Sequence, residues 1–88
     1  MQTGSGRGRV LDNIVEKQII NYKALLGKKV RSLRQESELS QESLSERCGI
    51  FRTYLSRIES GSANPSIAVM VSLALALSVQ PHELLVHD

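Results

Sequence analysis

The 88-residue sequence is poor in cysteine and in aromatic residues, with one cysteine, Cys48, and three aromatics, Tyr22, Phe51 and Tyr54. A single cysteine can form neither an intramolecular disulfide nor a cysteine cluster for zinc, and it fits a reducing, cytoplasmic compartment. Three aromatic rings offer few platforms on which the bases of a single strand could stack. We therefore expect no disulfide scaffold, no zinc domain and no stacking platform.

Long apolar runs are also missing. The longest, residues 67–79, spans 13 residues with serines inside it, whereas about 18 are needed to cross a bilayer. Residues 1–10 are polar and glycine-rich, unlike a secretion signal. A chain of this length holds one compact domain with a modest core, to which a partner chain can add. We predict no membrane segment, and we interpret residues 67–79 as a core helix.

The small net charge of +2 hides an uneven distribution. Residues 1–34 contain eight Lys and Arg against two acidic residues, whereas residues 35–88 contain three against seven. A basic half is typical of proteins that bind a polyanion or an acidic partner. The alternative is an ordinary solvated helix face.

Apolar residues recur in steps of three and four from residue 11 onward, which predicts a helix. They are Leu11, Val15, Ile19, Tyr22, Leu26, Val30 and Leu33. We place a break near residues 21–23, because Asn21 and Gly27 are weak helix formers. This gives a flexible arm at residues 1–10, an additional helix at 11–22 and the main domain at 23–88.

Two short helices follow, joined by a tight turn. Ser40 is a good N-cap for a helix at residues 41–48, and Gly49 can adopt the positive φ that ends it. A second helix is predicted at residues 51–60. Further on, Pro65 is expected to open a helix to residue 78, and Pro81 a last short one to residue 86. The fold class is therefore all-α.

The predicted helix at residues 51–60 has two unlike faces. Its apolar arc holds Phe51, Tyr54, Leu55 and Ile58, which we expect to be buried. Its opposite arc holds Arg52, Thr53, Ser56, Arg57 and Ser60, with no carboxylate. Arg can bond guanine edges and small hydroxyl residues allow close approach to a DNA groove. In isolation, this helix could equally present a plain solvated surface.

The residues before this helix favour the DNA-binding interpretation. A short helix, a glycine turn and a second helix fit into residues 41–60, which is the spacing of a helix-turn-helix. This segment and its flanks read SQESLSERCGIFRTYLSRIESGSANPS. It resembles the Cro/C1-type (Xre) family of transcriptional regulators, over roughly residues 25–86. The resemblance implies a five-helix lambda-repressor-like domain, here with an extra N-terminal helix. It also implies binding of double-stranded DNA, with Arg52, Thr53, Ser56 and Arg57 as candidate base contacts.

Gln41 matches a family glutamine that resembles a phosphate anchor, and we also assign Ser62 and Asn64, after the helix, as phosphate contacts. Phe51 departs from the family pattern, because it stands where a small hydroxyl residue usually caps the recognition helix. Ser45 likewise replaces a usual buried alanine.

Arg34 and Glu59 lie at matching shoulders of their helices, and both this placement and the resemblance predict a structural ion pair between them. Catalytic groups are poorly represented. Cys48 falls on an inward face and is interpreted as a core thiol, while His82 and His87 have a poor spacing for binding one metal ion. We expect no enzyme activity, no metal, no cofactor and no small-molecule ligand.

The function predicted is a cytoplasmic, sequence-specific DNA-binding transcriptional regulator, repressor or activator, that acts as a homodimer. The dimer interface is assigned to Leu84, Leu85 and Val86, with the apolar stripe at Leu11, Val15 and Ile19 as the alternative surface. A competing hypothesis is an antitoxin-like or adaptor protein, in which the N-terminal helix binds a partner and DNA binding is secondary.

Overall fold

The first element is one long helix, α1 (Ser5–Glu36), in the computed structural model, which describes residues 5–87. The break expected near residues 21–23 is wrong, because the apolar steps continue unbroken from Tyr22 through Leu26 to Val30. A single Asn lowers helix stability by less than about 1 kcal/mol, which is too little to break a helix, and at Gly27 the buried neighbours Leu26 and Val30 stabilise the helix. Residues 5–10 of the expected flexible arm belong to the same helix, and residues 1–4 lie outside the described part.

Three further α-helices and a 3₁₀ helix complete the fold. They are α2 (Gln41–Cys48), α3 (Arg52–Glu59), α4 (Ile67–Ala76) and η1 (Pro81–Leu85). The described residues are thus all-α, as predicted, but with four α-helices in place of the five plus one expected. The additional helix and the first helix of the domain are a single element, and the last short helix is 3₁₀.

The proline expected to open α4 does not lie in that helix. Pro65 precedes the N-cap, Ser66, whose hydroxyl accepts a hydrogen bond from the Val69 amide at 3.2 Å. A serine cap satisfies one of the free amides of a first turn, which a proline cannot do. Pro81 does begin η1 as predicted, with Gln80 and Glu83 forming a capping box before it.

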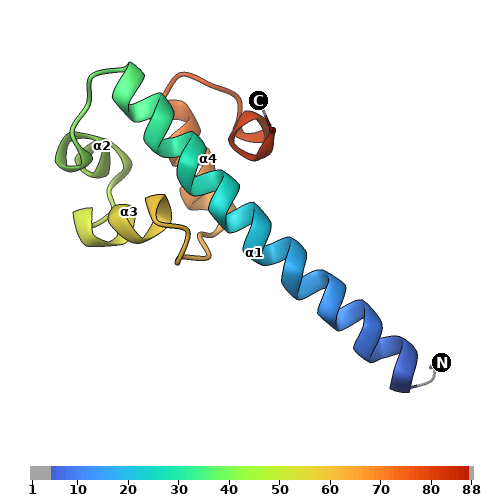
Figure 1. Cartoon of the computed structure of the whole chain (residues 1–88). Helices are drawn as coiled ribbons and strands as arrows, with labels where there is room; N and C mark the ends of the chain where they lie inside the picture. The colour runs from blue at the N-terminus through green and yellow to red at the C-terminus, as the bar shows by residue number, and fades with distance from the viewer. Residues whose placement is uncertain (1–4, 88) are drawn as a thin grey trace.

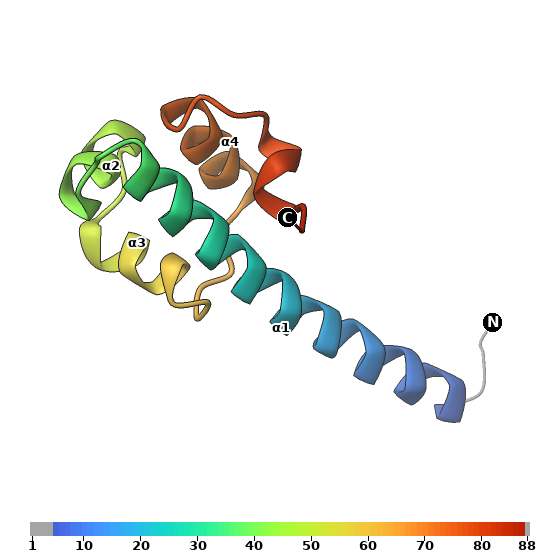
Figure 2. The same cartoon turned by 45° about the horizontal axis from the view of Figure 1, so that its top comes forward.

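The core lies where the C-terminal half of α1 meets the other helices. Helix α1 packs on α3 and η1, α2 on α3 and α4, and α4 on η1 (Figures 1 and 2). The largest fully buried side chains are aliphatic: Val30, Leu44, Leu55, Ile58, Leu73 and Leu84. Every element contributes one or more of them, so the five elements form a single core.

The N-terminal half of α1 projects away from this core (Figure 1). The molecule therefore measures 50 × 26 × 20 Å. All residues from 10 to 22 are exposed. The projecting segment, residues 10–22, thus contributes little to the monomer core.

Candidate nucleic-acid interface

Helices α2 and α3 are joined by a tight turn that the local sequence dictates. The Ser40 hydroxyl caps α2 by accepting a hydrogen bond from the Ser43 amide at 3.0 Å. Gly49 ends the helix with φ 68°, a left-handed conformation that favours glycine. The Ile50 amide then bonds the Ser45 carbonyl at 3.0 Å, which closes the turn. The boundaries of this unit agree with the prediction to within a residue.

Gly27 determines how closely α3 lies against α1. A Cβ atom at this position would lie 2.5 Å from the Ile58 carbonyl oxygen and 2.6 Å from that of Glu59. The two helix backbones are therefore in direct contact, which only glycine allows. We had treated Gly27 solely as a weak helix former. A glycine inside an otherwise regular helical stripe is the signal in the sequence that indicates a packing role.

A buried charge network joins α1, α2 and α3. Arg34 donates from Nε to Glu59 Oε2 at 2.7 Å and from Nη2 to Oε1 at 3.0 Å, so the predicted ion pair is present. The Glu59 side chain is 4% exposed and that of Arg34 12%. Arg34 Nη1 also donates to the Leu39 carbonyl, and Gln41 Nε2 to Glu59. The hydrogen bond to Glu59 raises the pKa of Arg34, although burial opposes the shift.

The charge network fixes the orientation of α3 relative to α1 and α2. Glu59 lies at the C-terminal end of α3, and its carboxylate receives donors from the end of α1 and the start of α2. A carboxylate buried in this way is stable only when its acceptor sites are filled. The three helices are therefore held in one relative orientation.

The outer face of α3 carries the predicted base-contacting residues. Arg52, Thr53 and Arg57 are exposed, and Ser56 is half-buried. Glu59 is the one carboxylate of α3, every residue of which the structure describes, and it is buried. The exposed face therefore presents two guanidinium groups and small hydroxyl residues with no opposing negative charge.

Phe51 was predicted to be buried with the apolar arc of this helix, and this prediction is wrong. Its side chain is 83% exposed, because Phe51 is the N-cap residue with extended backbone angles, φ −72° and ψ 144°, and so does not follow the helical wheel. It makes no side-chain cap bond, as expected for a residue without a hydroxyl. The other three residues of the arc, Tyr54, Leu55 and Ile58, are buried or half-buried.

The predicted phosphate contacts have different surroundings. Gln41 is half-buried and uses one amide hydrogen on Glu59, which leaves the second available. The Ser62 hydroxyl donates to the Arg57 carbonyl at 3.2 Å and lies 3.1 Å from the Ser60 hydroxyl, so it caps the C-terminal end of α3. Asn64 is exposed.

The three residues assigned to a dimer interface differ in how far they are buried. Leu84 is fully buried in the core of its own chain, because η1 points it back toward α1 and α4. It is therefore not accessible to a partner. Leu85 is half-buried and Val86 is exposed, so these two residues remain on the surface.

Cys48 lies between α2 and α4. Its thiol donates to the Ser72 carbonyl at 3.7 Å, and the Ser72 hydroxyl donates to the Cys48 carbonyl at 3.3 Å. Burial raises the pKa of the thiol, and the hydrogen bond to Ser72 offsets part of that rise. The protonated thiol is thus favoured, which agrees with the packing role predicted for it.

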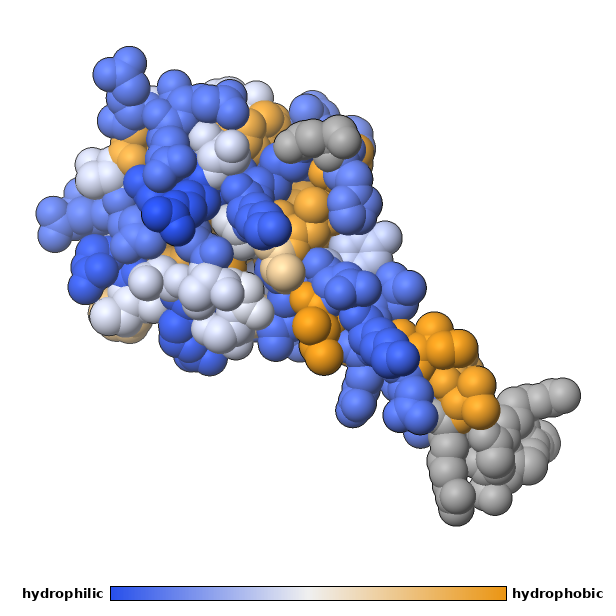
Figure 3. Space-filling view, in the orientation of Figure 1, coloured by the Kyte–Doolittle hydropathy of each residue, from blue (hydrophilic) through white to orange (hydrophobic). Residues whose placement is uncertain are grey.

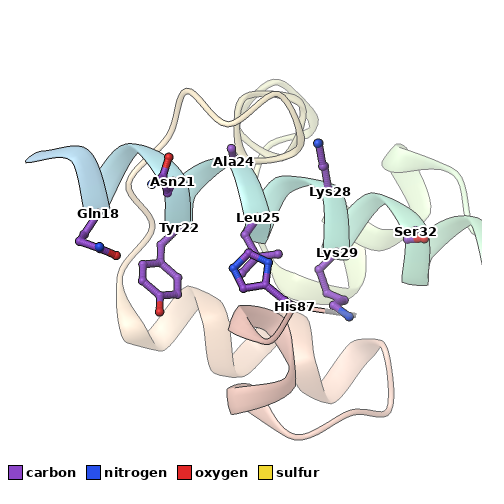
Figure 4. Close-up of a pocket in the computed structure, with 9 residues that line it drawn as sticks. All are labelled: Gln18, Asn21, Tyr22, Ala24, Leu25, Lys28, Lys29, Ser32 and His87. Carbon is purple, nitrogen blue, oxygen red and sulfur yellow. The ribbon is translucent and has the colours of Figure 1, made fainter.

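An open hollow of about 670 Å³ lies along α1, and its lining includes Tyr22, Lys28, Lys29 and His87 (Figure 4). The His87 ring lies over Leu25 in this view. Among the described residues, no group of three or more His, Cys, Asp and Glu side chains is arranged to hold a metal ion. Nor does any helix within residues 5–87 have the length and apolarity to cross a membrane.

These features define a helix-turn-helix domain with a basic outer helix. Residues 30–84 match the helix-turn-helix family, and the chain belongs to this family, in its Cro/C1 (Xre) branch. Control protein C.BamHI of Bacillus amyloliquefaciens is 44% identical over 66 residues, covering 74% of this chain and 82% of that protein.

Two solved structures resemble the chain closely. The restriction-modification controller protein C.AhdI of Aeromonas hydrophila has a TM-score of 0.69 at 37% identity, covering 70% of this chain and 94% of that one. SinR, a master regulator of biofilm formation solved in complex with DNA, has a TM-score of 0.67 at 34% identity, covering 69% and 98%.

Proposed function

We propose that the protein is a transcriptional regulator that binds a specific double-stranded DNA operator as a homodimer, with α3 in the major groove. One observation carries the proposal: the outer face of α3 exposes Arg52, Thr53 and Arg57 and no carboxylate. The similarity to control proteins and to SinR, solved with DNA, supports it. The proposed site of action is the cytoplasm, and the proposed role is not catalytic.

The expected base contacts lie along the exposed face of α3 and at its N-cap. Arg52 and Thr53 lie in its first turn, the end that enters the groove in helix-turn-helix proteins, and an Arg can donate two hydrogen bonds to guanine. Ser56 and Arg57 follow one turn later. The exposed ring of Phe51 lies beside Arg52 and can contact the methyl group of a thymine.

Gln41, Asn64 and Ser62 are proposed to contact phosphates. The second amide hydrogen of Gln41 provides a donor at the N-terminus of α2, where the helix dipole favours an anion. Ser62 would have to exchange its bond to the Arg57 carbonyl. Phosphate contacts of this kind position the helix but do not distinguish sequences.

The test compares Arg52→Ala with Gln41→Ala on a DNA site selected from random duplexes and on its single-base variants. Arg52→Ala should cost about 1–3 kcal/mol per half-site and relax the preference at one base pair, whereas Gln41→Ala should weaken all sequences alike. Arg31→Ala, which removes the same charge from an exposed position on α1, is the matched control. A uniform loss across all variants for Arg52→Ala would remove Arg52 from the base-contacting set.

The second candidate function, a protein-interaction module, is favoured by the projecting apolar segment of α1. The dependence of binding affinity on salt concentration distinguishes the two candidate functions. A regulator that contacts about six to ten phosphates loses affinity steeply as ionic strength rises, whereas binding through apolar side chains responds little. A flat salt dependence with no sequence preference would favour the interaction module.

A further inference from the structure

The projecting segment of α1 carries an apolar stripe that the monomer does not cover. Its members are Leu11, Ile14, Val15, Ile19 and Tyr22, each between 45% and 59% exposed. At 100° per residue they lie on one side of the helix. Apolar side chains gather on this projecting segment in the space-filling view (Figure 3). A contiguous stripe of this kind, unlike scattered apolar residues, marks an interaction surface.

The stripe continues into an apolar groove at the edge of the core. This groove, about 320 Å³ in volume, lies between α1 residues from Ile14 to Leu26 and an opposite wall formed by Pro65, Met70 and Leu85. Leu85 is one of the two accessible residues of the predicted dimer interface. The two surfaces considered from the sequence, the stripe and the C-terminal residues, are thus parts of one continuous surface, here called the α1 surface.

The size of the α1 surface suits a second copy of the chain. At their exposures, the five stripe residues leave on the order of 500 Å² of apolar area open to water on each copy, so two copies paired about a two-fold axis would bury about 1,000 Å². With the stripe fully covered, that total is at about 1,000 Å², the lower bound for a biological interface, and the walls of the groove add to it. In the monomer the same area stays in contact with water, at a cost that pairing removes.

Charges along the stripe are arranged for an antiparallel pair. Asp12 and Glu16 lie on one edge of the stripe near the free end of α1, and Lys23 lies on the same edge nearer the core. Two antiparallel helices place the same edges against each other, so Lys23 of each copy faces the acidic pair of the other. Because of the two-fold axis, this contact between Lys23 and the acidic pair occurs twice in the dimer.

We propose that the α1 surface is the homodimer interface, occupied by α1 of a second copy in antiparallel orientation. The inference rests on the homodimer of the proposed function, but it assigns the interface to α1 with Leu85 in the groove. It makes Leu84, which is buried in its own core, a residue of the fold only.

The first test uses two neighbouring isoleucines of α1, of which one lies within the stripe and the other about 100° further round the helix. Ile19 belongs to the stripe, whereas Ile20 lies outside it and is 65% exposed. Ile19→Asp should raise the dimer dissociation constant about 10- to 100-fold. Ile20→Asp, the matched control, should leave it within about threefold. Sedimentation of the full chain without DNA measures both, and circular dichroism checks that the helix content is kept.

The second test addresses the orientation. Glu16→Lys and Lys23→Glu should each weaken the dimer severalfold, because each creates a like-charge contact across the interface. The double variant restores the opposite-charge contact between positions 16 and 23, while Asp12 stays acidic, and should therefore recover much of the affinity that each single variant loses. Failure of the double variant to recover would overturn the antiparallel arrangement.

Two outcomes overturn the interface itself. One is a parent chain that stays monomeric at about 100 µM, which leaves the α1 surface without a second copy. The other is a dimer that Ile19→Asp and Ile20→Asp leave equally intact. Neither outcome bears on α3, because binding of the Ile19→Asp monomer to a single half-site reports DNA recognition separately. Loss of half-site binding in the parent would instead contradict the proposed function.

Discussion

The two halves of α1 share one apolar spacing but have opposite surroundings. Leu26 and Val30, in the C-terminal half, are buried beneath the other helices, whereas Leu11 and Val15, in the projecting segment, are about half exposed. Periodicity reports which side of a helix is apolar. It does not report what covers that side, which depends on segments distant in the sequence or on another chain.

The largest effect is expected at the buried charge of the core half. Glu59→Gln should lower the free energy of unfolding by about 3–5 kcal/mol, because it leaves the part-buried Arg34 without a counter-charge. Glu16→Gln, the same change on the projecting segment, should have an effect within about 0.5 kcal/mol. Urea denaturation at a concentration where the chain is monomeric measures both. If Glu59→Gln unfolds like the parent, the network contributes little to stability.

A second pair compares the same apolar residue in the two halves. Leu26→Ala should cost about 2–5 kcal/mol, because it opens a cavity among buried side chains. Leu11→Ala should leave monomer stability nearly unchanged, since its side chain is 59% exposed. Thermal or urea unfolding of dilute protein compares them. Equal losses would show that the projecting segment packs on the core in solution.

The smallest effect concerns an exposed apolar residue at the start of α3, the helix that packs against the C-terminal half of α1. Phe51→Ser should stabilise the protein by about 0.5–2 kcal/mol, because a serine at the N-cap of α3 can accept a hydrogen bond from the Tyr54 amide. Phe51→Ala removes the ring without adding a cap and serves as the control. A melting temperature that is no higher for the serine variant than for the alanine variant would contradict this account of the N-cap.

Local chemistry made the helix-turn-helix unit predictable. The side chain of Ser40 caps the start of α2, and the backbone of Gly49 ends the helix with a positive φ. Both residues adopt the conformations expected. The exposed positions of Arg52 and Arg57 and the pairing of Arg34 with Glu59 also follow from helical angles. Each of these features depends on a few neighbouring residues or on one well-placed charge pair.

Features that depend on distant contacts were missed. The role of Gly27 depends on carbonyl groups more than thirty positions away, at Ile58 and Glu59. The break expected near Asn21 gave too much weight to one weak helix former, because a single Asn costs less than about 1 kcal/mol and α1 continues through it. Phe51 was misplaced because the helical wheel was extended one residue before the helix begins.

The backbone contact at Gly27 has a mechanical consequence. Because α1 and α3 touch main chain to main chain and Glu59 joins both to α2, α1 and α3 move as one rigid body. The direction in which the free end of α1 points therefore sets the direction of α3. If two copies pair through α1 as proposed, α1 fixes the separation and the tilt of the two α3 helices. One residue inserted between Ile19 and Leu26 would rotate the projecting segment by about 100° relative to the core. The half-site spacing that the pair can span would then change.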